Sequence, residues 1–253
     1  MYEGFAYVYD RMMSDIPYDA WFDALRTYLA EHGIEEGTVC ELGCGTGSMT
    51  ERFARAGFHM IGVDLSADML AAASSRKDTE GLDILYIQQD MEQLELAGPV
   101  DAVISVCDTM NYVLEETAMG RVFSRVCRFL KPGGYFIFDL KTVYCYRNVI
   151  GSRVFAEQDE DVSYIWDNYY DEDEQINEYA LTIFQRQPKS RLYERIDEVH
   201  YQRAYSASTV RELLEQSGLM VAGVLDSSMK GEPKENSERI YVIAKKREDI
   251  DEQ

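Results

Sequence analysis

A glycine-rich turn between an apolar strand and a helix constrains this chain more than any other feature. Residues 39–50 read Val-Cys-Glu-Leu-Gly-Cys-Gly-Thr-Gly-Ser-Met-Thr. Gly43, Gly45 and Gly47 lack a Cβ, so the backbone can adopt positive φ and lie directly against a ligand. The amides at the N-terminus of the next helix then face that ligand. The pattern predicts a nucleotide-cofactor loop in an α/β sheet.

Two later strand-like runs each end in an acid. The run 60–63 is followed by Asp64, where a second parallel strand would deliver a carboxylate able to accept both ribose hydroxyls. Nicotinamide and adenosyl cofactors share that ribose, so Asp64 alone does not choose between them. The run 86–89 ends at Asp90, beside the hydrophobic Met91.

The order of these motifs resembles one known family. Glu41-x-Gly43-x-Gly45-x-Gly47 is similar to motif I of the class I S-adenosylmethionine-dependent methyltransferases. The segment 100–106 resembles their motif IV strand, and Leu-Lys-Pro-Gly-Gly at 130–134 resembles the turn into their fifth strand. The resemblance implies an α/β fold with a Rossmann-like, seven-stranded, mostly parallel sheet, helices on both faces and an antiparallel last strand.

The same resemblance implies S-adenosyl-L-methionine as the cofactor and gives each motif a place in its site. In the family, the residue matching Asp90 bonds the adenine amino group and the one matching Met91 packs on the ring. The implied cofactor-binding residues are Tyr9, Glu41, Gly43, Cys44, Gly45, Gly47, Asp64, Leu65, Met69, Gln89, Asp90, Met91, Val106 and Cys107.

Hydrophobic periodicity predicts an alternation of helices and strands. Helices are expected over 17–32, 48–56, 66–76 and 115–129, and after an N-cap at Ser206 or Ser208 up to Gly218. Period-two patterning predicts an inserted antiparallel sheet from the segments 162–170, 176–186 and 191–205, with a loop at Pro188. We therefore predict a cofactor domain at 1–140 and 206–246 with an N-terminal helical cap, an inserted acceptor lid at 141–205, and a charged tail at 247–253.

An insertion before the last helix resembles the small-molecule branch of the family, which includes sugar N-methyltransferases and glycine- or sarcosine-type N-methyltransferases. The segment 2–10, together with residues 18–21, resembles a part of those enzymes that folds over the cofactor and contributes an aromatic hydroxyl, here that of Tyr9. Candidates for contact with the acceptor are His200 in the insertion and Asn111 and Tyr112 just beyond motif IV. Asp108 is equally explained as a loop-forming or helix-capping residue.

The net charge of the chain narrows the possible classes of substrate. The formal net charge of −21 repels phosphate backbones, so we expect no nucleic-acid partner. Residues 154–185 carry ten acids and no base. They fit either a solvated acidic hairpin or a surface that attracts a cationic or amine-bearing substrate.

Composition is that of a globular enzyme, with 46% hydrophobic and 28% charged residues. We expect no membrane span and no signal peptide, and a cytoplasmic monomer or homodimer. The five cysteines form no C-x-x-C pair, so they predict buried thiols and no metal site.

Two other functions fit parts of the pattern. A NAD-dependent oxidoreductase could use a related sheet, but its G-x-G-x-x-G fingerprint would need a glycine at Ser48. A noncatalytic protein that binds S-adenosylmethionine would keep the same glycines and acids. Methyl transfer to the nitrogen or oxygen of a small-molecule acceptor accounts for the most features.

Overall fold

The structure is a computed structural model that describes residues 5–158, 160–187 and 190–248. The expected loop at Pro188, the first four residues and most of the predicted tail lie outside the described residues. A seven-stranded sheet has the strand order β10-β11-β5-β4-β1-β2-β3, and only β11 runs antiparallel to its neighbours. The predicted Rossmann-like sheet with an antiparallel last strand is therefore confirmed. Its strands are β1 (Thr38–Leu42), β2 (His59–Asp64), β3 (Ile84–Gln88), β4 (Val100–Ser105), β5 (Leu130–Lys141), β10 (Leu219–Asp226) and β11 (Arg239–Lys246).

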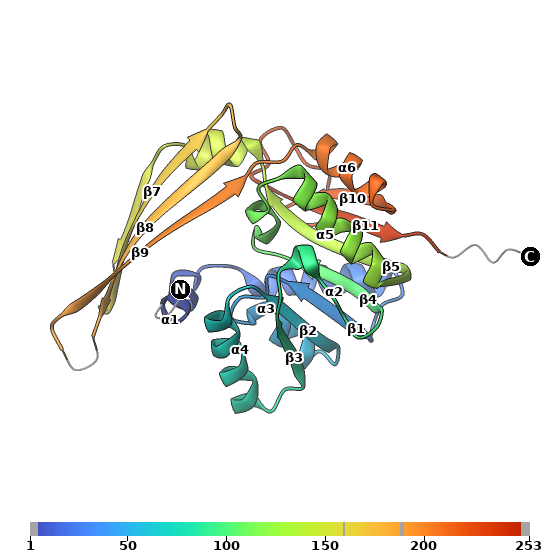
Figure 1. Ribbon diagram of the computed structural model, residues 1–253, viewed down its shortest axis with the longest axis horizontal. Coiled ribbons are helices and arrows are strands. Elements are labelled where there is room, and N and C mark those ends of the chain that lie inside the picture. Colours follow the sequence, from blue (N-terminus) through green and yellow to red (C-terminus); the bar gives the residue numbers. More distant parts are fainter. Residues whose placement is uncertain (1–4, 159, 188–189, 249–253) are drawn as a thin grey trace, which may run out of the picture.

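Helices cover both faces of this sheet (Figure 1). On one face Leu25 and Leu29 of α2 pack with Phe53 of α3, and on the other Phe123 of α5 packs with Leu214 of α6. The helices are α1 (Phe5–Met12), α2 (Tyr18–Glu31), α3 (Ser48–Arg55), α4 (Ala67–Glu80), α5 (Glu116–Phe129) and α6 (Ala207–Gln216), with short 3-10 helices η1 (Met91–Gln93) and η2 (Thr109–Tyr112). Both layers are apolar because parallel strands are buried on their two faces.

A second, antiparallel sheet of order β6-β7-β8-β9 extends away from the first (Figure 1). Its strands are β6 (Val154–Gln158), β7 (Val162–Asp171), β8 (Ile176–Arg186) and β9 (Tyr193–Arg203). Its buried face packs Val162 and Ile183 against Val8 of α1 and Met69 of α4. We call this four-stranded sheet the lid sheet. It therefore contacts α1, part of the predicted N-terminal cap, and α4.

Three features differ from the sequence predictions or sharpen them. Helix α4 runs to Glu80, beyond the predicted end at residue 76, and stops at Gly81, whose φ of 70° is left-handed. Strand β6 was not predicted, because it is an edge strand with four exposed residues of five and no alternation. Ser206 is the N-cap of α6, since its hydroxyl accepts a hydrogen bond from the amide of Thr209.

Candidate active site at the glycine loop

The glycine loop joins β1 to α3 and is held from the neighbouring strand by Asp64. The amide of Gly45 donates a 2.7 Å hydrogen bond to one carboxylate oxygen of Asp64, and the amide of Ser66 donates a 2.8 Å bond to the other. Burial raises the pKa of Asp64, and these amide bonds oppose the rise. Each oxygen keeps a lone pair, so the carboxylate can anchor the loop and still accept a ribose hydroxyl.

The glycines of the loop face different surroundings. A Cβ built on Gly43 would overlap the side chain of Thr109, whereas one built on Gly45 would meet only Tyr9 Cε1 at 4.0 Å. Both residues have positive φ. Gly43 is therefore needed for packing inside the protein, and Gly45 leaves the open space through which a cofactor can lie against the backbone. The loop fits an S-adenosylmethionine cradle on this observation.

A cavity lies above the loop and gathers residues from four separate segments of the chain. Seven of the predicted cofactor-binding residues line it, namely Tyr9, Glu41, Gly43, Cys44, Gly45, Val106 and Cys107. Tyr18, from the N-terminal part that the resemblance places over the cofactor, lines it too. So do Thr46, Ser48, Met49 and Thr109, which the sequence did not single out as site residues. Their positions follow from the fold, because Tyr18 begins α2 and Thr109 begins η2 beside the loop.

Glu41 is buried beneath this cavity at the end of β1. Its carboxylate accepts a short hydrogen bond from the hydroxyl of Thr50 in α3. Burial raises the pKa of Glu41 to about 8, against the lowering effect of that bond. A buried carboxyl at this place can bind a cationic group of a cofactor, which would compensate its lost hydration.

The remaining predicted cofactor residues lie along the edge formed by the ends of β2 and β3. Leu65 is 69% exposed beside Asp64. Asp90 caps η1 by accepting a 2.9 Å bond from the amide of Glu92, and Gln89 uses its side-chain amide on the backbone of Glu95. Met91 packs against the main core, and Met69 is buried between α4, α1 and the lid sheet. Leu65 therefore presents an exposed apolar side chain next to Asp64 at this edge.

Helix α1 is fastened over the loop by charged and polar groups. Arg76 of α4 donates a 2.8 Å bond to Asp10 and a 3.1 Å bond to Glu51, and it also bonds the carbonyl of Thr46. The hydroxyl of Thr46 bonds Asp10 in turn. These contacts place Tyr9, the neighbour of Asp10, above Gly45.

Cys107 and Asp108 follow motif IV strand β4 with φ values of 65° and 53°. Two consecutive left-handed residues other than glycine store backbone strain, which needs support from the surroundings. Asp139 provides this support, because its carboxylate accepts a 3.0 Å hydrogen bond from the backbone amide of Asp108. The Asp108 carboxylate is in turn contacted by Lys141 at 2.9 Å and by Arg239 at 2.8 Å.

The lid sheet joins the same cluster. The amide nitrogen of Gln202 in β9 donates a 2.8 Å bond to Asp108, while its oxygen accepts bonds from the hydroxyls of Tyr146 and Tyr179. Burial alone would raise the pKa of Asp108, but the charges of Lys141 and Arg239 outweigh it and lower the pKa to about 2. Asp108 is thus a buried anion that ties the lid to the core, beyond the loop-forming or capping role expected of it.

The three candidates for acceptor contact lie on facing elements. The rings of Tyr112 in η2 and His200 in β9 are perpendicular, with centroids 5.9 Å apart. Asn111 is fully buried, and its side-chain nitrogen donates to the carbonyls of Lys141 and Arg203. The Asn111 oxygen accepts the Lys141 amide at 3.0 Å. The amide of Asn111 therefore joins η2 to β5 and β9.

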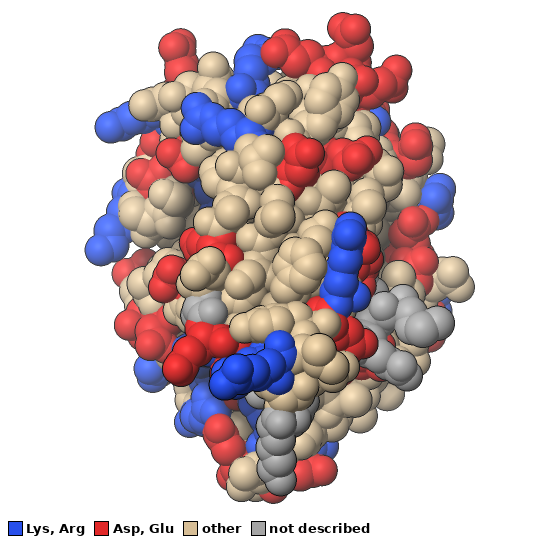
Figure 2. Space-filling view, turned by 90° about the vertical axis from the view of Figure 1, so that its left-hand side faces the viewer, with Lys and Arg blue, Asp and Glu red and all other residues tan. Residues whose placement is uncertain are grey.

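Acidic side chains surround the end of the molecule that carries the lid sheet. Figure 2 shows them mostly towards the margins of this face, with uncharged side chains and several Lys and Arg side chains between them. Register places Asp167 and Glu178 on the face of the lid sheet opposite its buried residues. Among the described residues, no helix is both long and apolar enough to cross a membrane.

Comparisons with known proteins agree with this geometry. Residues 39–134 match a family model described as a methyltransferase domain. A chain from Geobacillus sp. that is described as a methyltransferase is 36% identical over 246 residues, covering 97% of this chain and 99% of that one. A crystal structure of an S-adenosylmethionine-dependent methyltransferase from Clostridium acetobutylicum has a TM-score of 0.88 at 28% identity, covering 97% of this chain and 99% of that chain.

The fold extends to more distant enzymes. The sugar N-methyltransferase KedS8 from Streptoalloteichus has a TM-score of 0.79 at 16% identity, covering 96% of this chain and 93% of that one. Its likeness concerns the fold alone. The relatives that span nearly the whole chain decide against the oxidoreductase alternative. The chain belongs to the class I S-adenosylmethionine-dependent methyltransferases and is an enzyme that uses this cofactor.

Proposed function

We propose that this methyltransferase acts on the nitrogen or oxygen of a small-molecule acceptor bound between Cys107 and the lid sheet. The observation that carries the proposal is the meeting of β9 with η2. His200 lies against Tyr112 there, and Gln202 bonds Asp108, the residue after Cys107. An acceptor in this place would touch both the cofactor cavity and the lid.

Bound S-adenosylmethionine supplies an activated methyl group on a sulfonium. The chain therefore has mainly to orient the acceptor and to exclude water. Tyr9 and Tyr18 would help with both tasks, because they line the cofactor cavity together with Cys107. The predicted cofactor residues, from Glu41 at the buried end to Asp90 at the adenine edge, hold the donor in line.

His200 is the proposed group that receives a proton from the acceptor. Burial lowers the pKa of His200 below its ordinary value of 6.5, so the imidazole is neutral at neutral pH. A neutral imidazole can accept a proton from an ammonium or hydroxyl group. Tyr112 stacks edge-on against the imidazole and would share its contact with the acceptor, whereas Asn111 acts as a positioning residue.

Charge supports an uncharged or amine-bearing acceptor over a nucleic acid. The excess of acids would repel a phosphate backbone and would concentrate a cation near the lid. We also propose that the protein is cytoplasmic and is a monomer or a homodimer.

Incubation with methyl-labelled S-adenosylmethionine and a metabolite library, read by mass shift, tests this proposal. Total RNA and genomic DNA serve as parallel acceptors. We expect labelled small molecules with the wild type and none with a Gly45→Val variant. Label found only in RNA, or in no fraction at all, would overturn the assignment of the acceptor.

A further inference from the structure

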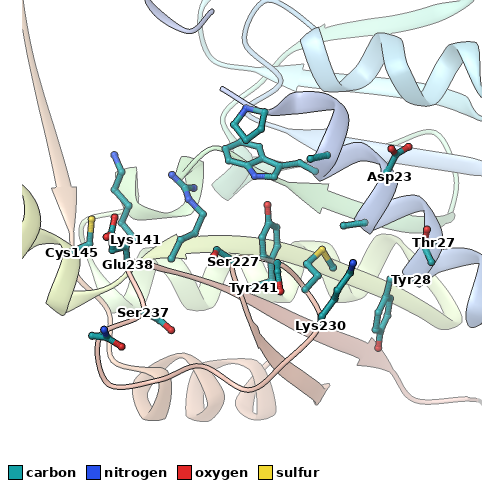
Figure 3. A pocket seen from close by; sticks show the side chains of 18 of the residues that line it. Asp23, Thr27, Tyr28, Lys141, Cys145, Ser227, Lys230, Ser237, Glu238 and Tyr241 are labelled. Atoms are coloured by element: carbon teal, nitrogen blue, oxygen red, sulfur yellow. The ribbon is translucent and has the colours of Figure 1, made fainter. Parts of the chain in front are cut away.

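A cavity of about 1190 Å³ lies on the other side of α2 from the glycine loop, and no motif accounts for it. We call it the α2 cavity. Figure 3 shows it between α2, the start of β11 and the loop 227–238. A ligand site of 300–1,000 Å³ holds a drug-sized molecule, so this space is large enough for a metabolite.

Its inner wall is aromatic. Trp21 and Tyr28 of α2 face Tyr241 of β11, and Met229 of the loop packs on the same core cluster. The guanidinium of Arg239 lies 5.1 Å from the centre of the Trp21 ring. Flat, polarisable walls of this kind favour a planar apolar group.

One polar atom in this wall lacks a partner. Among the described residues, the Tyr241 hydroxyl has no hydrogen-bond partner, although the residue is fully buried. Figure 3 shows the ring of Tyr241 rising from its strand into the space below α2. A buried hydroxyl without a partner is unfavourable, and a ligand that offers an acceptor atom would relieve this.

The side chain that can open this place is Met229. It is half-buried, and its φ of 56° is left-handed, so the loop holds it in a strained conformation. Methionine is flexible and can repack at small energetic penalty. Because Tyr241 is fully buried, a ligand that reaches its hydroxyl must displace a side chain of this cluster, and Met229 is the flexible one that also lines the cavity.

The charges around the cavity select against an anionic ligand. Lys141 and Arg239 both line it, but both are already paired with Asp108. The other charged residues of its lining are Asp23, Glu31, Lys230 and Glu238. Three of these four are acids and one is a base, and serine and asparagine side chains of the loop complete the polar outer rim.

We infer that the α2 cavity binds an uncharged aromatic group that carries a carbonyl or similar hydrogen-bond acceptor, and that this group is part of the methyl acceptor. The second half rests on the proposed function. It follows from the closeness of the two cavities. Lys141 and Arg239 of the α2 cavity contact Asp108. The neighbour of Asp108, Cys107, lines the cofactor cavity. Tyr18 and Trp21, three residues apart on α2, face one cavity each.

Acetophenone is a suitable probe, because it has a flat ring, one carbonyl oxygen and no charge. α-Methylstyrene has nearly the same shape without the oxygen and is the matched control ligand. The chain has two tryptophans, so a Trp166→Phe variant assigns the indole N–H signal of Trp21 in an NMR spectrum of the labelled protein. Titration then follows Trp21 directly.

We expect acetophenone to shift the Trp21 signal, and Tyr241→Phe to weaken its binding by about 3- to 10-fold, the effect of one neutral hydrogen bond. The binding of α-methylstyrene should be unchanged in that variant. Tyr170→Phe is the control variant. Among the described residues, the Tyr170 hydroxyl is also buried without a hydrogen-bond partner, but it lies outside the cavity. Its removal should change the affinity for neither ligand. Equal acetophenone affinity in wild type and Tyr241→Phe, or no shift at Trp21, would refute the site.

The labelled-methyl screen separates this inference from the proposed function. If acetophenone binds in a manner that depends on Tyr241 while no metabolite is methylated, the site stands and the proposed function fails. If small molecules are methylated and Tyr241→Phe leaves their KM unchanged, the α2 cavity is not part of the acceptor site. A supporting result is a methylated aromatic compound whose KM rises in Tyr241→Phe at constant kcat.

Discussion

Gln202 of the lid sheet donates a 2.8 Å hydrogen bond to Asp108, the residue that follows Cys107 of the cofactor cavity. This bond connects a strand near the end of the insertion to the strained turn after β4. The position of the lid and the shape of the cofactor cavity therefore depend on the same carboxylate.

Replacement of Asp108 by Asn should destabilise the protein strongly. The change leaves Lys141 without its carboxylate partner in a buried place, which lowers the free energy of unfolding by about 3–5 kcal/mol. Urea denaturation followed by circular dichroism measures it. Asp167→Asn, at an exposed site of β7, is the control and should change stability by less than about 0.5 kcal/mol.

The stability that Asp108 contributes should also depend on pH in a defined window. Its pKa is lowered from 3.8 to about 2 in the folded state. The contribution is therefore complete above the unfolded value and disappears as the pH falls from about 4 to 2. A wild-type unfolding free energy that falls no more steeply there than that of Asp108→Asn would contradict the assignment.

Gly45→Ala should abolish tight cofactor binding while the fold persists. The new Cβ enters open space above the loop, so no protein atom is displaced, but the methyl group occupies the path of the ligand. We expect the Kd for S-adenosylmethionine to rise at least about tenfold in calorimetry. Gly43→Ala is the informative comparison: both glycines have positive φ, but only at Gly43 would the Cβ also overlap Thr109, so Gly43→Ala should lower the melting temperature further.

Asp64→Ala should weaken S-adenosylmethionine binding by about tenfold or more, since a charge-assisted hydrogen bond contributes about 1.5–3 kcal/mol. The Gly45 amide also loses its partner, so the loop becomes less ordered. Calorimetry with wild type, Asp64→Ala and the exposed-site control Asp83→Ala measures the effect. Wild-type affinity in Asp64→Ala would show that the carboxylate does not contact the ribose.

The rate of methyl transfer should fall at acidic pH because His200 must be neutral. Burial lowers its pKa below 6.5, so the acidic limb of kcat/KM should have its midpoint below that value. The acceptor found in the labelled-methyl screen serves as the substrate. His200→Gln should lose this limb and leave the Kd of S-adenosylmethionine unchanged, and a limb that persists in the variant would exclude His200 as the base.

Local patterns predicted the parts of the site that depend on neighbours in sequence. The glycine loop, Asp64 after β2 and Cys107 after β4 each end a strand of the parallel sheet, so topology brings them to one edge. Helix boundaries with a clear cap were also predictable, as Ser206 and Gly218 show.

The Asp108 cluster was beyond prediction from the sequence. Lys141, Gln202 and Arg239 lie more than 30 residues from Asp108, and each sits at a strand end with no distinctive pattern. These residues come together because β11 pairs with β5 and because the end of β9 lies against the turn that follows β4. The α2 cavity has the same origin, because its walls come from α2, β5 and the loop before β11.

The two ends of the insertion meet at one side chain. Asn111 bonds the backbone of Lys141, where the chain leaves the seven-stranded sheet, and that of Arg203, where it returns. When the two ends of a segment are fixed side by side, the entropic penalty of closing the segment grows only slowly with its length. Relatives can therefore exchange this module for a longer, shorter or differently shaped one while the cofactor half stays unchanged, and new acceptors can evolve without a new donor site.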